Sequence, residues 1–186
     1  MVALGMGLRS VGKQARMYSP DGVSPMYRFL PLSEEVVSSV GREEVDWAQV
    51  VVLLDCDGPS RTAALEAFLE RAAVVVDIDH HEAERAFGGV RWVEPRRAAV
   101  AEMIYELLQD LGVEVTPAIA TALLTGIYVD TGSLRYRNTK PETYAVCAEL
   151  VGLGARPEEV SGWLYEVRSL PALLILGEVL RGAQAD

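Results

Sequence analysis

The sequence predicts an α/β fold: a three-layer α/β/α arrangement around a mainly parallel sheet, followed by a helical C-terminal part. Two short runs rich in β-branched residues, 50–54 and 73–76, have the length and composition of parallel strands that are covered on both faces. From residue 97 onward, apolar residues recur at the spacing of helices instead. The 186 residues suit one compact domain, because chains divide into several domains mainly above about 250 residues.

The N-terminal half is expected to alternate between helices and strands. A short apolar helix is expected at 2–11, closed by Gly12, and a strand at 14–18 that ends in the turn residues 19–22. A helix at 60–70, with Ser60 as its N-cap, links the strands 50–54 and 73–76. A further strand is expected at 90–93, after the glycine pair 88–89.

The C-terminal half is expected to be almost entirely helical. Proline stands at or near the first turn of several segments, where its fixed φ favours helix initiation. The expected helices cover 98–111, 117–129, 141–150, 157–167 and 170–183.

Composition excludes several classes of protein. The chain carries 17 Lys and Arg against 27 Asp and Glu, a net charge of −10, which argues against a protein that coats duplex DNA or packages RNA. Half of the residues are hydrophobic, which is too many for a disordered chain. Cys56 and Cys147 form no metal-binding or disulfide pattern, and no apolar run approaches the ~20 residues of a membrane span. A reducing, cytoplasmic location and no membrane partner are therefore predicted.

Acidic and histidine residues follow two of the predicted strands. Asp55 ends the first, and Asp79-His80-His81 ends the second; these are the only histidines in the chain. Because ligands of parallel α/β sheets bind at the carboxyl ends of the strands, both clusters should face one crevice. Carboxylate and imidazole ligands without a thiolate favour Mn²⁺, Fe²⁺, Co²⁺ or Mg²⁺ over structural zinc, with Mn²⁺ the first choice. Asp57 is better explained by turn chemistry and Asp77 by a hydrogen-bonding role.

A third acid, Asp130, follows a segment that is apolar nearly all round. A buried carboxylate must be paired or coordinated, so Asp130 is a candidate ligand; the alternative is a helix-ending turn that uses Gly132. The polar loop beyond it contains Arg135 and Arg137, which are either solvated or contact a phosphate or base of the substrate.

These motifs resemble those of a known family. Asp55 at a strand end, Asp79-His80-His81 and then Asp130-Thr131-Gly132 are similar, in order and spacing, to motifs two to four of the DHH phosphoesterase superfamily. The flanking sequences 93–95 and 101–107 look most like the bacterial nano-RNase branch, oligoribonucleases that also dephosphorylate 3′-phosphoadenosine 5′-phosphate. The resemblance covers nearly the whole chain.

The resemblance implies roles for individual residues. Asp55 would be shared by two Mn²⁺ ions, His80 and Asp130 would complete the shell of one of them, and His81 would contact the scissile phosphate. Asp79 would orient the histidines from behind. Two such ions activate a water and stabilise the entering and leaving oxygens of an in-line displacement.

The first family motif, of the type H-x-x-P-D-x-D-x-x-G-S, has no match. Near Pro20-Asp21-Gly22, Val23 and Met17 stand where an Asp and a His would be needed. We therefore expect residues 1–167 to form a catalytic domain without its first strand, and 168–186 to form a helix leading toward a second domain. About one weakly held Mn²⁺ and little activity are expected of this chain alone.

The resemblance leaves substrate and assembly open. Short single-stranded RNA or a small nucleotide is the expected partner, and a homodimer is compatible with the sequence. The alternatives are a cyclic-dinucleotide phosphodiesterase, a single-strand exonuclease of the same superfamily, or a non-catalytic nucleotide- or metal-binding protein.

Overall fold

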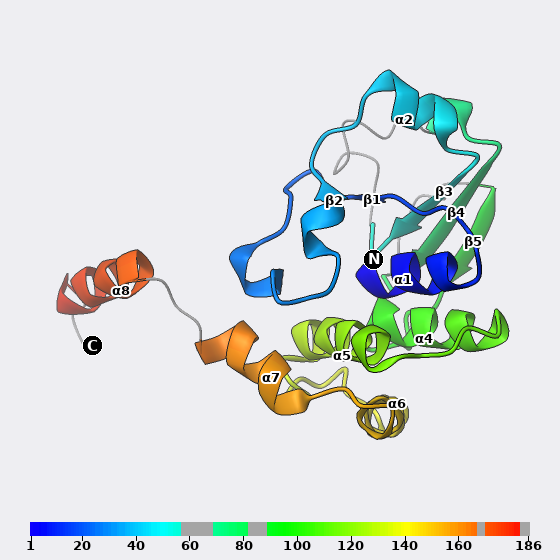
Figure 1. The fold of residues 1–186 in the computed structure, drawn as a ribbon. Helices are drawn as coiled ribbons and strands as arrows, with labels where there is room; N and C mark the ends of the chain where they lie inside the picture. Colours follow the sequence, from blue (N-terminus) through cyan, green and yellow to red (C-terminus); the bar gives the residue numbers. More distant parts are fainter. Residues whose placement is uncertain (57–68, 82–88, 167–169, 183–186) are drawn as a thin grey trace.

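The computed structural model describes residues 1–56, 69–81, 89–166 and 170–182. A three-stranded sheet contains β3 (Val50–Leu54), β4 (Val74–Asp79) and β5 (Val90–Val93), in the order β3-β4-β5, and both pairs are parallel (Figure 1). The register sets Leu54 beside Ile78 and Asp79 beside Val93, so the strands end at the same edge of the sheet. The predicted α/β class with a parallel sheet is confirmed.

A second, smaller parallel sheet pairs β1 (Met17–Tyr18) with β2 (Val36–Val37). The strand expected at 14–18 is shorter than predicted, because only residues 17 and 18 have ladder partners on β2. Two 3₁₀ turns, Pro25–Tyr27 and Ser33–Glu35, lie between β1 and β2.

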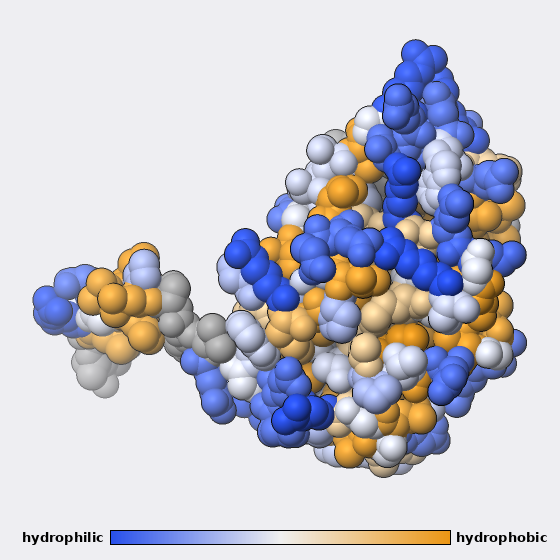
Figure 2. All heavy atoms as spheres, in the orientation of Figure 1, coloured by the Kyte–Doolittle hydropathy of each residue, from blue (hydrophilic) through white to orange (hydrophobic). Residues whose placement is uncertain are grey.

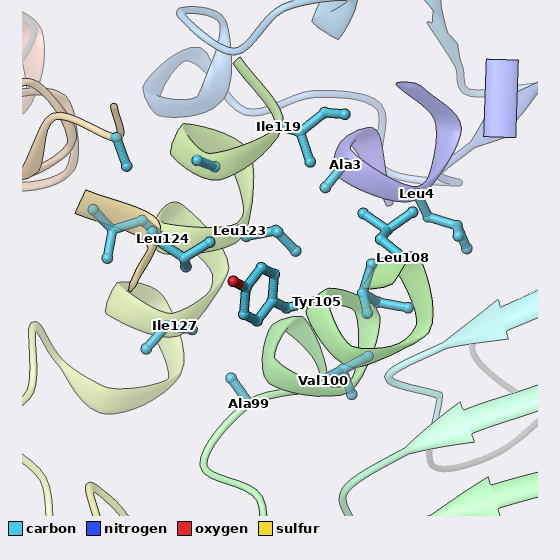
Figure 3. Close-up of a cluster of buried hydrophobic side chains, with 14 of the residues drawn as sticks. Ala3, Leu4, Ala99, Val100, Tyr105, Leu108, Ile119, Leu123, Leu124 and Ile127 are labelled. Atoms are coloured by element: carbon cyan, nitrogen blue, oxygen red, sulfur yellow. The ribbon is translucent and has the colours of Figure 1, made fainter. Parts of the chain in front are cut away.

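The three-stranded sheet is covered on both faces, as the β-branched runs predicted. On one face, Ile78, Val52 and Trp92 pack into the main core with α1 (Val2–Ser10), α4 (Val100–Asp110) and α5 (Pro117–Thr131). Side chains from these three helices meet there, and the largest are fully buried (Figure 3). On the other face, Leu53 and Val75 pack against Val45 of α2 (Arg42–Trp47).

The C-terminal part is helical, as expected. α6 (Pro141–Gly152) and α7 (Pro157–Ser161) pack against α5. The helix expected at 157–167 changes into a π-helical segment, Gly162–Glu166, whose Trp163 ring stacks on Phe29 with centroids 5.6 Å apart. The helix expected at 60–70 lies largely outside the described residues; its last turn, 69–71, is helical.

The last described helix, α8 (Leu170–Gly182), projects away from the remainder of the described molecule (Figure 1). All of its residues are exposed, its leucines included, and hydrophobic residues cover much of its visible surface (Figure 2). Among the described helices, α8 included, none has the length and apolar character needed to cross a membrane.

Candidate metal centre

Asp55 is the first residue after β3, and its backbone is left-handed, with φ of 60°. Its N–H donates to the Ile78 carbonyl at 3.1 Å, so the ladder with β4 continues to Asp55 before the chain turns. Aspartate tolerates this conformation better than most residues. The turn leaves the carboxylate of Asp55 at the carboxyl edge of the sheet, 45% exposed.

Asp79 is the last residue of β4, and its side chain is buried, with 1% of its surface exposed. Its Oδ1 accepts three hydrogen bonds: from the backbone N–H of His80 at 2.6 Å, from the backbone N–H of His81 at 3.0 Å, and from Nδ1 of His81 at 2.8 Å. A single carboxylate oxygen therefore fixes both the loop that carries the histidines and the ring of one of them.

The tautomer of His80 follows from its partner. Nδ1 of His80 lies 3.1 Å from the Arg97 carbonyl oxygen, which can only accept, so Nδ1 carries the proton. The other ring nitrogen, Nε2, lies 3.4 Å from Oδ1 of Asp55. A carbonyl behind the ring is the usual arrangement for a metal-ligating histidine, because it orients Nε2 toward the ion.

Asp55, His80 and His81 together form a group whose candidate ligand atoms all lie within 4.8 Å of one another. Two donor atoms bound to one ion at about 2.1 Å are roughly 3.0–3.4 Å apart when they subtend 90–109° at the ion. The 3.4 Å between His80 Nε2 and Asp55 Oδ1 falls in that range. The donor set and its spacing therefore fit a divalent cation.

The carboxylates of the site shift the pKa of His80. The hydrogen bond to Asp55, opposed by burial and helped by the Arg97 carbonyl and by Asp130, raises the pKa of His80 to about 9. Without a cation, a protonated His80 therefore takes the place of the positive charge that the carboxylates require.

Asp130 lies within the last turn of α5, whereas the sequence suggested that it follows the helix. Burial and repulsion by Asp55 raise the pKa of its carboxyl to about 6, while His80 and His81 act in the opposite direction. Asp130 thus belongs to the same electrostatic cluster, although it lies outside the close group of Asp55, His80 and His81. Its role as a ligand stays a prediction.

A cavity of about 560 Å³ opens beside these residues, and both Asp55 and Asp130 line it. Its other walls come from the start of α1, the turn after β1, and apolar residues of α4 and α5 such as Ile104 and Val129.

The remaining predicted residues are more dispersed. Asp77 is buried and faces Arg91 of β5, with Nε of the arginine 3.4 Å from Oδ2, in keeping with a hydrogen-bonding role. Arg135 donates to the Gly132 carbonyl and lies over the Tyr165 ring, and Arg137 is exposed. A contact of Arg135 or Arg137 with substrate stays a prediction. Asp57 lies outside the described residues.

Sequence reasoning missed the groups that hold the site from behind. The Arg97 carbonyl is a backbone group, so the residue type at position 97 does not predict its contact with His80. Asn138 donates from its side-chain amide to the carbonyls of Ala98 and Asp130, at 3.1 and 3.0 Å. The sequence offered only a polar loop there.

Residues 1–127 match the N-terminal domain of the DHH family, and the chain belongs to that family. It falls in the nano-RNase branch, as its motifs predicted: it is 38% identical over 173 residues to the "Bifunctional oligoribonuclease and PAP phosphatase NrnA" of Thermus thermophilus, covering 93% of this chain and 51% of that protein. The same-named protein of Bacillus subtilis is 27% identical over 164 residues, covering 87% of this chain and 50% of that one. The chain therefore spans about half the length of these curated relatives.

Two further similarities bear on fold and branch. An exopolyphosphatase-related protein from Bacteroides fragilis matches the whole chain with a TM-score of 0.90 and 21% identity, over 57% of its own chain, which shows the shared fold. The "Cyclic-di-AMP phosphodiesterase PdeA" of Listeria monocytogenes is 34% identical over 137 residues, covering 70% of this chain and 20% of that one.

Proposed function

We propose that this chain is the metal-binding part of a Mn²⁺-dependent phosphoesterase that hydrolyses short oligoribonucleotides and 3′-phosphoadenosine 5′-phosphate. The observation that carries the proposal is the convergence of Asp55, His80 and His81 at one end of the parallel sheet, with both imidazoles oriented from behind. The names of the Thermus and Bacillus relatives supply the substrate class. A cytoplasmic location is part of the proposal, in line with two free cysteines.

Asp55, His80 and Asp130 would hold the cation. Once bound, a divalent cation would polarise a phosphate oxygen and lower the pKa of a bound water. The other steps belong to side chains of this chain. Asp79 accepts from Nδ1 of His81, which fixes the tautomer and leaves Nε2 of this 52% exposed ring without a proton. In that tautomer Nε2 would be able to accept a hydrogen bond or a proton from the substrate.

Metal binding tests the proposal first. Calorimetric titration of the chain with Mn²⁺ should show about one weakly held ion, since the family resemblance assigns Asp55, His80 and Asp130 to one ion and His80 and His81 are the only histidines. Asp55→Ala should abolish the binding. Asp110→Ala, which changes an exposed acid at the end of α4 that does not line this cavity, is the matched control and should leave binding unchanged. Two tight ions, or unchanged binding in Asp55→Ala, would contradict the assignment.

Hydrolysis tests it second. We expect the 186-residue chain alone to release no measurable 5′-mononucleotides from RNA of two to five residues. The same chain, within a protein that also carries the first motif and second domain of the family, should do so with Mn²⁺. In that longer protein His81→Ala should abolish turnover with little loss of metal, whereas His80→Ala should reduce both. Robust hydrolysis by the chain itself would refute the two-ion assignment.

A cyclic-dinucleotide phosphodiesterase is the second candidate, favoured by the similarity to the Listeria protein. Parallel assays with cyclic di-AMP and with dinucleotide RNA distinguish the two. A longer protein that binds Mn²⁺ but cleaves neither substrate would favour the non-catalytic alternative.

A further inference from the structure

Two backbone carbonyls of the candidate metal centre share one donor. The side-chain amide of Asn138 donates to the Ala98 carbonyl at 3.1 Å and to the Asp130 carbonyl at 3.0 Å. Both partners are acceptors only, so the NH₂ group, and not the oxygen, must face them. Asn138 therefore connects two segments of the chain that are 32 positions apart, from 98 to 130, by way of one residue.

Each of these segments supports one candidate ligand. Ala98 directly follows Arg97, whose carbonyl accepts from Nδ1 of His80 and so orients Nε2. Asp130 is itself the second candidate. By holding both carbonyls, Asn138 fixes the distance between the support of His80 and the end of the helix that carries Asp130.

The segment 94–98 is otherwise held by contacts within the segment, with α4 and with Lys140. Arg97 pairs with Glu94 at 3.0 Å and with Glu106 of α4. From the loop that carries Asn138, Lys140 donates to the Arg96 carbonyl at 2.6 Å. Lys140 and Asn138 thus come from the same loop and hold neighbouring carbonyls, but of the two only Asn138 also reaches the Asp130 backbone.

The turn between α5 and Asn138 has an unusual backbone. After α5, Gly132, Ser133 and Leu134 all have positive φ, of 56°, 58° and 64°. Non-glycine residues adopt this conformation rarely, and where the surroundings impose it, it tends to mark functional sites. The backbone N–H groups of Arg135 and Tyr136 then donate back to the Thr131 carbonyl at 2.9 and 3.0 Å, which closes the turn.

We propose that Asn138 is a positioning residue of the metal centre, which holds Asp130 and the support of His80 in the arrangement that receives the cation. This inference rests on the proposed function, since it assumes that Asp130 and His80 bind the ion. It assigns no contact between Asn138 and the ion or the substrate.

The test compares Asn138→Asp and Asn138→Ala with the neighbouring Thr139→Val. Asn138→Asp keeps the shape and removes both N–H donors. Thr139→Val also keeps the shape and removes a hydroxyl that is buried without a hydrogen-bond partner in the described part of the chain, so it serves as the matched control. Mn²⁺ affinity is measured by calorimetry, and the melting temperature of each metal-free protein by circular dichroism.

Both Asn138 variants should bind Mn²⁺ about 10- to 100-fold more weakly than wild type, the range typical of groups that orient metal ligands, while Thr139→Val should bind as wild type does. Variants with a lowered melting temperature but wild-type affinity would show that Asn138 only stabilises the loop, and would overturn the proposal. If the wild-type chain takes up no Mn²⁺, the proposed function fails before the role of Asn138 is reached.

If both variants fail to fold, nitrogen-15 spectra of the wild-type protein test the role of Asn138. Addition of diamagnetic Zn²⁺ should shift the side-chain amide resonances of Asn138 in nitrogen-15 spectra and slow their exchange with water, because the ion orders both of its carbonyl partners. A Zn²⁺ titration that shifts the histidine resonances and leaves the Asn138 amide unchanged would overturn the coupling.

Discussion

At the scale of single residues, the pKa of His80 connects the candidate metal centre to stability. In the metal-free protein this pKa is about 9, compared with 6.5 for an unperturbed histidine. The folded state therefore holds the proton more tightly than the unfolded state. Its contribution to stability is complete below pH 6.5 and is lost as the pH rises through 9.

We expect the titration of His80 to lower the melting temperature of the metal-free chain as the pH is raised from 6.5 to 9, most clearly above pH 8. Below pH 8 the buried amino group of Met1, whose pKa burial lowers to about 6, acts in the opposite direction. The raised pKa of Asp130, about 6, acts in the same direction as His80 at lower pH, because its ionisation is disfavoured in the folded state. His80→Gln should flatten the profile between pH 6.5 and 9. Thermal melts by circular dichroism, with metal removed by a chelator, measure both. A profile that rises toward pH 9 would show that His80 is neutral in the folded chain.

Cys147 is a second residue whose pKa the fold shifts. Burial, with a smaller effect of Glu102, raises the pKa of its thiol to about 11. At pH 9 the thiolate fraction of such a thiol is about 1%, compared with about half for an ordinary one, and only the thiolate reacts with alkylating agents.

Alkylation of Cys147 by iodoacetamide at pH 9 should therefore be at least roughly 50-fold slower in the folded chain than in the same chain unfolded by urea. Peptide mass spectrometry follows Cys147 separately from Cys56, which is half-buried. Equal rates in the folded and unfolded chain would mean that the helices around Cys147 open readily.

At the scale of elements, the turn after α5 is tightly constrained. Gly132 has φ of 56°, and a Cβ built there would lie 2.4 Å from the ring of Tyr136. Both the backbone conformation and the ring therefore require glycine.

Gly132→Ala should lower the free energy of unfolding by about 1–3 kcal/mol. Gly152→Ala, at the end of α6, is the matched control: a Cβ there meets nothing within 4 Å, and the change should be neutral or stabilise by up to about 1 kcal/mol. Urea denaturation measures both. Equal effects of the two substitutions would contradict the constrained turn.

The sequence predicted the elements better than it predicted their ends. β3, β5 and the main helices followed from periodicity, because continuous β-branched runs and helical spacing are local signals. The strand near residue 14 was predicted too long, since its extent depends on a partner strand about 20 residues away. Asp130 was expected beyond the end of the helix. The last turn of α5 instead continues to Thr131, and Gly132 ends the helix.

The candidate site was predictable to the same extent. Asp55, His80 and His81 converge because parallel strands end at one edge, a rule that the sequence alone can use. The Arg97 carbonyl and the bridging amide of Asn138 were beyond it. Each depends on a loop path set by tertiary contacts, and Arg97 contributes through its backbone carbonyl, which its residue type does not predict.

At the scale of the whole molecule, α8 exposes many apolar side chains. Leu170, Leu174, Ile175, Val179 and Leu180 are each more than 60% exposed. Apolar surface of this kind is unusual on a monomer and promotes association.

We expect the 186-residue chain to associate as its concentration rises. Changing Leu174 and Ile175 to Gln should reduce the association, because both exposed apolar side chains become polar without altering the net charge. Changing Glu178 and Arg181 to Gln, which removes an exposed ion pair on the same helix, is the control and should not reduce it. Sedimentation velocity measures the effect. A chain that stays monomeric at high concentration would contradict this expectation.

The position of β4 between β3 and β5 has a dynamic consequence. Among the described strands, β4 alone has ladder partners on both sides, so its amides should exchange with deuterated water more slowly than those of β3 and of the short pair β1–β2. Asp79, His80 and His81 extend directly from this central strand, whereas Asp55 extends from β3, which has a described partner on one side only. The imidazoles of His80 and His81 would then be attached to a rigid strand, whereas the carboxylate of Asp55 would be free to shift when a cation binds.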